Sequence, residues 1–290
     1  MAATPLAGKP LVQSAYRLLM QDKAMVVLLF VGGVFSAIAF GLIAFPLSIL
    51  RGGDAQGGVV GILIFGVALL ASTLVSVFFL GAVVAAAMMR ADGMDPDVRS
   101  ALGVAWSRRG PLLAWAVVST VVGMVLRSLE RSGLAGSIVR LLAGVAWAVA
   151  TWFAIPVIIA EGTMPIATIQ RSSEILRSKF GSNVRATVRL GVTWTLAMVA
   201  ALAVAGIGGW LLLTSAPRAY AAHNLGWMLL VIGVVAVFVV SAIWSAVSAY
   251  LKTVLYRYAV GLPTPGINPF DLPSMLPPPQ APSAQPYPFA

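Results

Sequence analysis

Residues 59–89, VVGILIFGVALLASTLVSVFFLGAVVAAAMM, form an uninterrupted run of 31 residues without a charged side chain. An α-helix needs about 20 apolar residues to cross the hydrocarbon core of a bilayer. A run of this length therefore predicts a transmembrane helix that tilts or projects beyond the lipid. A helix on the surface of a soluble protein would carry polar residues on its outer face, so this stretch decides the fold class.

The composition of the whole chain agrees with a membrane protein. Of its 290 residues, 60% are hydrophobic and 10% are charged, whereas soluble domains average about 45–50% apolar and about 25% charged residues. The net charge is +10. Because most charges flank the apolar runs, we expect anionic lipid head groups as the partner of this excess, and no nucleic acid.

Five further apolar runs complete a predicted all-α fold, a polytopic membrane bundle of about six transmembrane helices. The fourth run contains Pro156, and the sixth is expected to continue as a helix to Tyr258. The six predicted spans are residues 24–50, 59–89, 111–126, 141–160, 190–214 and 226–251. His223 falls between the last two spans and is expected in a short loop.

Three amphipathic segments, residues 11–23, 96–107 and 165–180, predict helices that lie in the membrane interface. In the second, Asp95 is expected to cap the helix and Pro96 to occupy its first turn. Its apolar side chains recur at helical spacing, namely Val98, Ala101, Leu102, Ala105 and Trp106. The third is expected to begin at Pro165, to end before Gly181 and to present one apolar face of Ile166, Ile169, Leu176 and Phe180.

The distribution of basic residues predicts the orientation of the chain. On the six-span interpretation, 14 of the 19 Lys and Arg residues lie on the side of the amino terminus. Cytoplasmic loops carry such an excess, so both termini are expected in the cytoplasm. Arg127, Arg131 and Arg140, on the opposite side, run against this trend.

Residues 262–290 differ in kind from the rest of the chain. Ten of these 29 residues are proline, and Asp271 is the only charged one. Such a segment cannot form a packed core and is expected to be extended or disordered. A groove that recognises extended proline helices could bind it, so we expect any protein partner on the cytoplasmic face.

The titratable residues suggest no catalytic, cofactor or metal site. The chain has no cysteine, and His223 is its only histidine, which excludes thiolate and multi-histidine sites within one chain. Glu161, after the fourth span, is expected to brace its loop. The three aspartates Asp92, Asp95 and Asp97 come closest to a metal cluster, but helix capping accounts for them better. The sequence therefore predicts a protein that is not an enzyme.

Two groups of residues are candidates for contacts with lipid and between helices. The first comprises basic residues expected to meet lipid phosphate: Arg108, Arg109, Arg171, Arg177, Lys179, Arg185 and Arg189. The second comprises small residues that recur every fourth position and let helices approach closely: Gly33, Ala37, Gly41, Ser241, Ser245 and Ala249. These small residues could pack the bundle internally or form a face for self-association, which would make a homo-oligomer.

Two stretches resemble a known family. They are SAYRLLMQDK at residues 14–23 and WFAIPVIIAEG at 152–162, the latter continuing through Pro165 to RSSEIL at 171–176. Together with the order of the spans, they are similar to bacterial and archaeal six-span proteins with a domain of unknown function. The second stretch also resembles, more loosely, the membrane domain of glycerophosphodiester phosphodiesterases. The resemblance implies a prokaryotic plasma membrane and provides no catalytic residue.

Two hypotheses about function follow. The first is a non-enzymatic membrane scaffold that organises lipids or protein partners, because interfacial helices, charge and the proline-rich tail share one side. The alternative is a transporter or channel for a neutral or lipidic solute, which needs a polar cavity between spans. The candidate lining residues of that cavity are Thr193, Thr195, Ser241 and Ser245.

Overall fold

The computed structural model describes residues 23–50, 59–129, 133–180, 184–214 and 220–262. Within these ranges all regular structure is helical, which confirms the predicted all-α class. The helices are α2 (Lys23–Leu50), α3 (Val59–Ala91), α4 (Val98–Ser107), α5 (Arg109–Leu129), α6 (Gly133–Ala150), α7 (Ala154–Glu161), α8 (Pro165–Phe180), α9 (Val184–Thr214) and α10 (Tyr220–Ala259). The predicted interfacial helix 11–23, apart from Lys23, and the tail beyond residue 262 lie outside the described residues.

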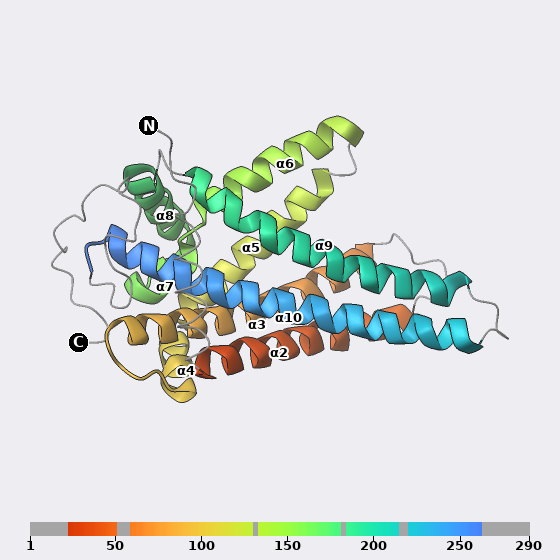
Figure 1. The fold of residues 1–290 in the computed structure, drawn as a ribbon. Coiled ribbons are helices and arrows are strands. Elements are labelled where there is room, and N and C mark those ends of the chain that lie inside the picture. Colours follow the sequence, from red (N-terminus) through yellow and green to blue (C-terminus); the bar gives the residue numbers. More distant parts are fainter. Residues whose placement is uncertain (1–22, 51–58, 130–132, 181–183, 215–219, 263–290) are drawn as a thin grey trace, which may run out of the picture.

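Long apolar helices cross the molecule in alternating directions. By length and composition, five described segments can cross a membrane: Leu63–Ala91, Arg109–Leu129, Gly136–Glu161, Thr195–Thr214 and His223–Ala259. Helix α2 is 28 residues long and includes the shorter apolar stretch Val27–Ala39. The short helices α4, α7 and α8 gather at one end of the bundle (Figure 1). We call this end the α4/α8 end.

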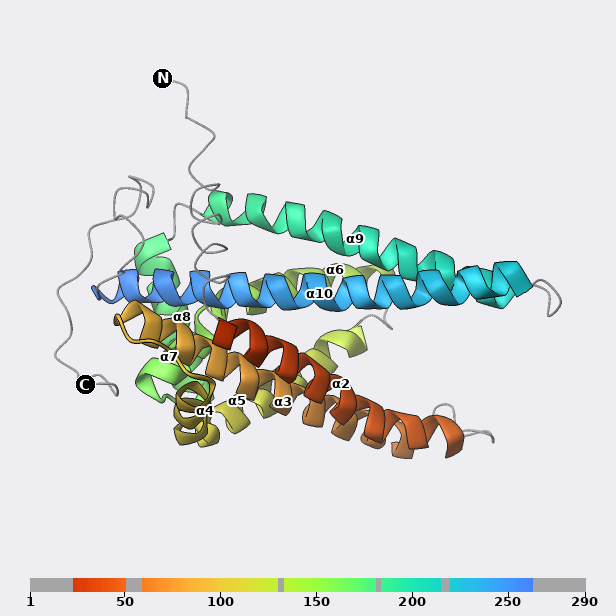
Figure 2. The same ribbon diagram turned by 60° about the horizontal axis from the view of Figure 1, so that its bottom comes forward.

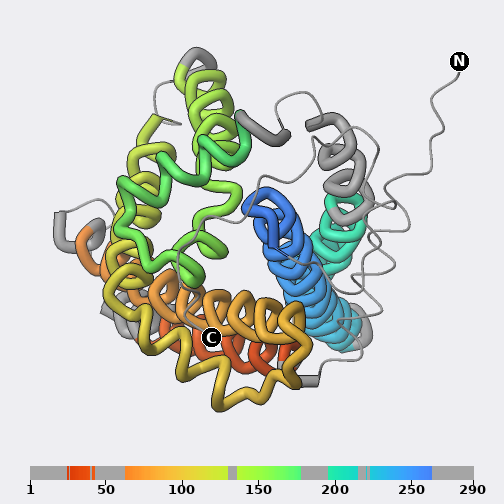
Figure 3. The backbone as a smooth tube through the Cα atoms, turned by 90° about the vertical axis from the view of Figure 1, so that its left-hand side faces the viewer, coloured from red at the N-terminus to blue at the C-terminus, as the bar shows by residue number. Residues whose placement is uncertain are grey.

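The long helices form three antiparallel hairpins, α2–α3, α5–α6 and α9–α10 (Figure 2). Seen from the α4/α8 end, the hairpins lie around a common centre (Figure 3). Helix α10 packs against α9, α3 and α2, whereas α6 packs against α5 and α8. The α5–α6 hairpin therefore diverges from α9–α10 toward the opposite end (Figure 1).

The densest packing lies at the α4/α8 end of α3. Residues 82–88 of this helix are at most 1% exposed, because α4, α5, α7 and α10 all pack on it. Elsewhere large apolar side chains point outward, as Leu142 and Val235 do at 65% and 55% exposure. Such faces are stable in lipid, which is as apolar as the side chains themselves.

The α9–α10 hairpin is packed backbone to backbone through glycines. A Cβ placed on Gly233 of α10 would lie 2.5 Å from the Cα of Ala205 in α9, and one on Gly208 would lie 2.8 Å from the Cα of Leu230. The sequence-based prediction of small-residue contacts did not include these two glycines. Between α2 and α3, the hydroxyl of Ser36 lies 2.9 Å from that of Ser72, a polar contact between neighbouring helices.

The predicted fourth span, 141–160, lies within the segment Gly136–Glu161 that can cross a membrane, but it is not one continuous helix. Helix α6 ends at Ala150, and α7 begins at Ala154 after a turn. Pro156 causes this break, because its ring would clash with the carbonyl of Trp152 in a continuous helix. In α7 it stands in the first turn, where a missing N–H costs nothing. The Oγ of Ser172 in α8 accepts the N–H of Phe153 at 3.1 Å, which satisfies the start of α7.

Two features of the predicted interfacial helices need correction. Helix α4 begins at Val98 with Asp97 as its N-cap, not at Pro96 with Asp95, because the Asp97 carboxylate accepts the N–H of Arg99 at 3.2 Å. Helix α8 has the predicted bounds, but its predicted apolar face is only partly buried: Ile169 and Leu176 pack against the core, whereas Ile166 is 76% exposed. Among the described side chains of α8, the most buried are Pro165, Thr168, Ser172 and Ile175.

The sixth helix is longer than its predicted span. Helix α10 runs from Tyr220 to Ala259, 40 residues, so His223 lies in a helix and the predicted loop position is wrong. The indole Nε1–H of Trp227 donates to His223 Nε2 at 3.2 Å, one helical turn away. The residues between Tyr220 and Gly226 include no proline or glycine, so nothing in this stretch interrupts the helix before the predicted span begins.

Candidate functional site

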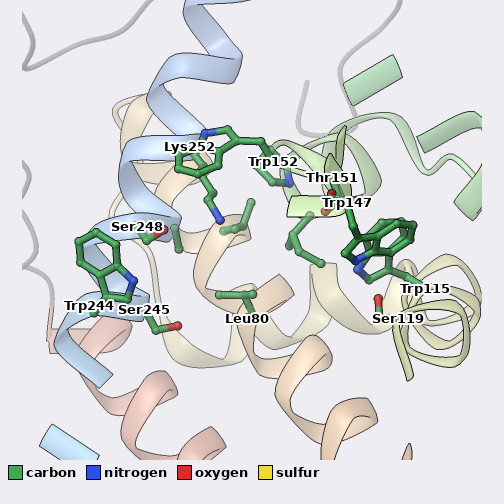
Figure 4. Close-up of a pocket in the computed structure, with 15 residues that line it drawn as sticks. Leu80, Trp115, Ser119, Trp147, Thr151, Trp152, Trp244, Ser245, Ser248 and Lys252 are labelled. Atoms are coloured by element: carbon green, nitrogen blue, oxygen red, sulfur yellow. Dashed lines mark hydrogen bonds between the residues drawn. The ribbon is translucent and has the colours of Figure 1, made fainter. Parts of the chain in front are cut away.

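A cavity of about 370 Å³ lies between α3, α5, α6, α7 and α10. Four tryptophans dominate its wall, Trp115, Trp147, Trp152 and Trp244 (Figure 4). The hydroxyl groups in the wall are those of Ser119, Thr151, Ser245 and Ser248, and Lys252 is the only charged residue among the described residues that line it. An aromatic wall with few polar groups is the usual composition of a small-molecule site.

The break between α6 and α7 builds one wall of this cavity. Trp152 stands in the turn itself, and Thr151 donates its hydroxyl to the carbonyl of Trp147 at 2.7 Å. Trp147 stacks on Trp115 of α5, with ring centroids 5.9 Å apart and an interplanar angle of 8°. The Pro156 break therefore places three of the four tryptophans around one space.

Lys252 is the cation of the cavity. Its Nζ lies 4.8 Å from the ring centroid of Trp152, a cation–π contact. Within the described ranges no carboxylate lies within 4.0 Å of this nitrogen. Lys252 is seven residues from the end of α10, about 10 Å along a helix. A cation at this depth is costly and typically marks a functional site.

A polar cluster closes the α4/α8 end beside the cavity. We define it as Asp92, Glu161, Arg171, Tyr256 and Arg257. The Oε1 of Glu161 accepts the Tyr256 hydroxyl at 2.8 Å and the Nε–H of Arg171 at 3.2 Å. These bonds join the end of α7 to α8 and α10, so Glu161 braces its loop as the sequence predicts.

Arg257 forms the most buried ion pair of the cluster. Its residue is 1% exposed, and its Nη2 donates to Asp92 Oδ1 at 2.6 Å. The same nitrogen lies 3.4 Å from the carbonyl oxygen of Ala91. These contacts hold the end of α10, the helix that carries Lys252, against the end of α3.

Arg171 keeps its charge in this cluster. Partial burial disfavours the guanidinium, but Glu161 and also Glu174, at 3.2 Å, outweigh it and raise the pKa of Arg171 above its ordinary value. Both carboxylates therefore face a permanent cation. Its guanidinium is held by protein carboxylates, and lipid phosphate is not needed to neutralise it.

The other predicted lipid contacts differ in their surroundings. Arg109 is exposed, with its guanidinium 5.5 Å from the ring centroid of Trp106, and Arg177 is exposed on α8. Arg108 is partly buried and covers the αL turn at Gly162. The side chains of Lys179, Arg185 and Arg189 lie outside the described part of the structure.

The predicted small-residue contacts are spread over different environments. Gly33 contacts Phe238 of α10: a Cβ there would lie 2.8 Å from the ring. Ala37 is exposed and Gly41 faces open space. Ser245 and Ala249 line the cavity, whereas Ser241 is exposed and donates to the carbonyl of Val237.

The three aspartates do not come together. Asp92 binds Arg257, Asp95 pairs with Arg90 at 2.9 Å, and Asp97 caps α4. In the described residues no group of three or more His, Cys, Asp or Glu could hold a metal ion.

Residues 59–265 match the sequence model of DUF6159, a family of unknown function. The chain belongs to this family. No curated protein matches it, and no solved structure does. The predicted membership of an uncharacterised family is thus confirmed, whereas the looser resemblance to glycerophosphodiester phosphodiesterases finds no support in these comparisons.

The DUF6159 match covers the whole candidate site. The lining residues of the cavity run from Leu80 to Lys252, and the polar cluster runs from Asp92 to Arg257. Helix α2 and most of the tail lie outside the match. The cavity and the cluster therefore belong to the part of the chain that defines the family.

Sequence reasoning missed Lys252, Tyr256 and Arg257 as site residues. All three lie near the end of the sixth apolar run, where basic and aromatic residues ordinarily mark the membrane interface. Their spacing offered a signal: Lys252 and Tyr256 are four residues apart and share one helix face. That face lies against α7, where Glu161 accepts a hydrogen bond from the Tyr256 hydroxyl.

Proposed function

We propose that this DUF6159 protein is a non-enzymatic membrane protein that binds anionic lipid at its α4/α8 end and positions protein partners there. On this proposal the α4/α8 end faces the cytoplasm of a prokaryotic cell, in the plasma membrane. The proline-rich tail, residues 262–290, would offer an extended peptide to a partner on the same side.

One observation carries the lipid-binding proposal. Among the described residues, Arg99, Arg108, Arg109 and Arg177 form no ion pair with a carboxylate. All four lie on or next to α4 and α8, the helices that occupy the α4/α8 end. We call them the basic rim. Anionic head groups attract such residues by about 1 kcal/mol each.

The geometry of α4 supports contact with the membrane interface. Trp106 is 62% exposed and packs edge-on against Phe78, with the ring centroids 6.2 Å apart. Arg109 lies over the same indole ring. Tryptophan and arginine side by side at the end of apolar helices are typical of the head-group region, where the indole is half solvated and the cation meets phosphate.

Neutralising the rim is expected to remove the preference for anionic lipid. The triple variant Arg99→Gln, Arg109→Gln, Arg177→Gln loses about 3 kcal/mol of attraction, so its affinity for phosphatidylglycerol over phosphatidylcholine should fall about 100-fold. Lipid exchange into nanodiscs, quantified by mass spectrometry, measures this ratio.

The matched control removes arginines from the opposite end. Arg127 lies over Phe65 at 5.9 Å and Arg140 lies on α6, so the double variant Arg127→Gln, Arg140→Gln should keep the wild-type lipid ratio. An equal loss in both variants would contradict a one-sided lipid surface.

The cavity favours a second candidate, the movement of a lipidic solute. Of the four hydroxyl residues expected to line such a path, Ser245 lies in the cavity wall, whereas Thr195 and Ser241 are exposed. Thr193 has no described side chain. Proteoliposomes that transfer no labelled lipid between leaflets would exclude this candidate.

A further inference from the structure

We propose that the tryptophan-lined cavity binds one anionic amphiphile, whose head group pairs with Lys252 and whose acyl chain lies against Trp115, Trp147 and Trp244. This site is separate from the basic rim, which lies on the surface of the α4/α8 end. It would hold one ligand molecule per chain in a fixed place.

The charge of the cavity selects an anion. Lys252 is the only charged residue in its described wall, and the Lys252 side chain points from α10 toward the middle of the lining residues (Figure 4). Long cations near a helix end normally extend toward water. Two carboxylates of the polar cluster are already paired, Glu161 with Arg171 and Asp92 with Arg257. A ligand oxyanion would supply the counter-charge that a desolvated cation needs.

The hydroxyl groups suit an oxyanion as well. Ser248 stands one helical turn before Lys252 on α10, so the two side chains share a face, and both line the cavity. The Thr151 hydroxyl in the opposite wall already donates to the carbonyl of Trp147, so it is not counted as a donor to the ligand. The Ser248 hydroxyl and the Lys252 ammonium can thus donate to the same head group.

The wall of the cavity farther from the α4/α8 end combines the large apolar side chains of Leu80 and Trp244 with the small hydroxyl residues Ser119 and Ser245. Trp244 is eight residues before Lys252 in α10, about 12 Å farther from the α4/α8 end. Leu80 of α3 and Trp115 of α5 also line the space. The head group would therefore lie near the interface and the chain in the hydrocarbon, which is the orientation of lipid in a bilayer.

The size of the cavity limits the ligand. A volume of about 370 Å³ holds roughly a dozen non-hydrogen atoms, if each takes about the 30 Å³ that a water molecule occupies. That is enough for a head group and the first part of one chain. The rest of the chain would extend out of the cavity into the surrounding lipid.

Two kinds of ligand combine an oxyanion head group with an acyl chain, namely a phosphate-bearing lipid and a fatty acid. The test uses the full chain in phosphatidylcholine nanodiscs with three probes of one chain length: dodecyl phosphate, laurate and dodecanol. At about 100-fold excess over Kd, a bound anion is expected to raise the Tm of the wild type by about 5 °C. A shift with dodecyl phosphate alone, or with laurate alone, supports the site and identifies the head group.

Two substitutions show whether the shift comes from this cavity. Lys252→Met is expected to fold, since it replaces a desolvated cation by an apolar chain, and to reduce the shift to under about 1 °C. Lys252→Arg should retain the shift, and so should the basic-rim triple variant. An unchanged shift in Lys252→Met, no shift with either anion in the wild type, or an equal shift with uncharged dodecanol would overturn the proposal.

Discussion

Replacing Asp92 with alanine is expected to lower the free energy of unfolding by about 3 kcal/mol, because it leaves the Arg257 guanidinium buried without its carboxylate. The pair is short, 2.6 Å, and the Arg257 side chain is only 2% exposed. It joins the ends of α3 and α10, two helices that are far apart in the chain. Unfolding by SDS titration in mixed micelles measures the loss.

An exposed pair in the same loop provides the control. Asp95 pairs with Arg90 at 2.9 Å, but its side chain is 92% exposed, so Asp95→Ala should cost less than about 1 kcal/mol. Adding Arg257→Met to Asp92→Ala should recover part of the lost stability, because no unpaired charge then stays buried. If Asp92→Ala costs no more than Asp95→Ala, the Arg257 pair does not stabilise the bundle.

Replacing Gly233 with alanine is expected to cost about 2 kcal/mol or more, because the new methyl group has no space. It would lie 2.5 Å from the Cα of Ala205, an atom of the α9 backbone that cannot rotate away. The helices α9 and α10 would have to separate over their closest contact. The same SDS titration measures the change.

Gly206, close to Ala205 on α9, is the matched control. A Cβ placed there meets nothing within 4 Å, so Gly206→Ala should change stability by less than about 1 kcal/mol and could raise it through helix propensity. Equal effects of the two substitutions would show that close packing at Gly233 does not hold the hairpin together.

Hydropathy is sufficient to predict the long helices, because an apolar helix is stable in a bilayer whichever helices pack beside it. The 31-residue run 59–89 is almost the whole of α3, and the amphipathic segment 165–180 is α8. The same reasoning wrongly assigned Ile166 to the apolar face of α8 and did not predict that Ser172 is buried. The Ser172 hydroxyl accepts the N–H of Phe153, and nothing local to α8 predicts a partner 19 residues away.

The candidate site was harder to predict, since its parts meet only through packing. Glu161 and Tyr256 are 95 residues apart, and Arg257 and Asp92 are 165 apart. The sequence places Pro156 within the fourth span, but it does not show where the turn places Trp152, whose ring contacts Lys252 of α10. In the sequence Lys252 has the context of an ordinary helix end, because the residues that form the opposite wall of the cavity, such as Trp147 and Trp152, are about 100 residues away in the chain.

We propose that α5 crosses the membrane with the α4/α8 end in the cytoplasm. Ser107 and Ser128 stand at its two ends, 21 residues or about 30 Å apart. Both are exposed, and each donates only to a carbonyl of its own helix. Because the chain has no cysteine, Ser107→Cys and Ser128→Cys each provide a single thiol.

Labelling these thiols in intact cells with a membrane-impermeant maleimide tests this topology. We expect Ser128→Cys to be labelled from outside and Ser107→Cys to be labelled only after the membrane is permeabilised. Labelling of both positions from the same side would contradict the crossing of α5, and the reverse pattern would contradict the cytoplasmic position of the α4/α8 end.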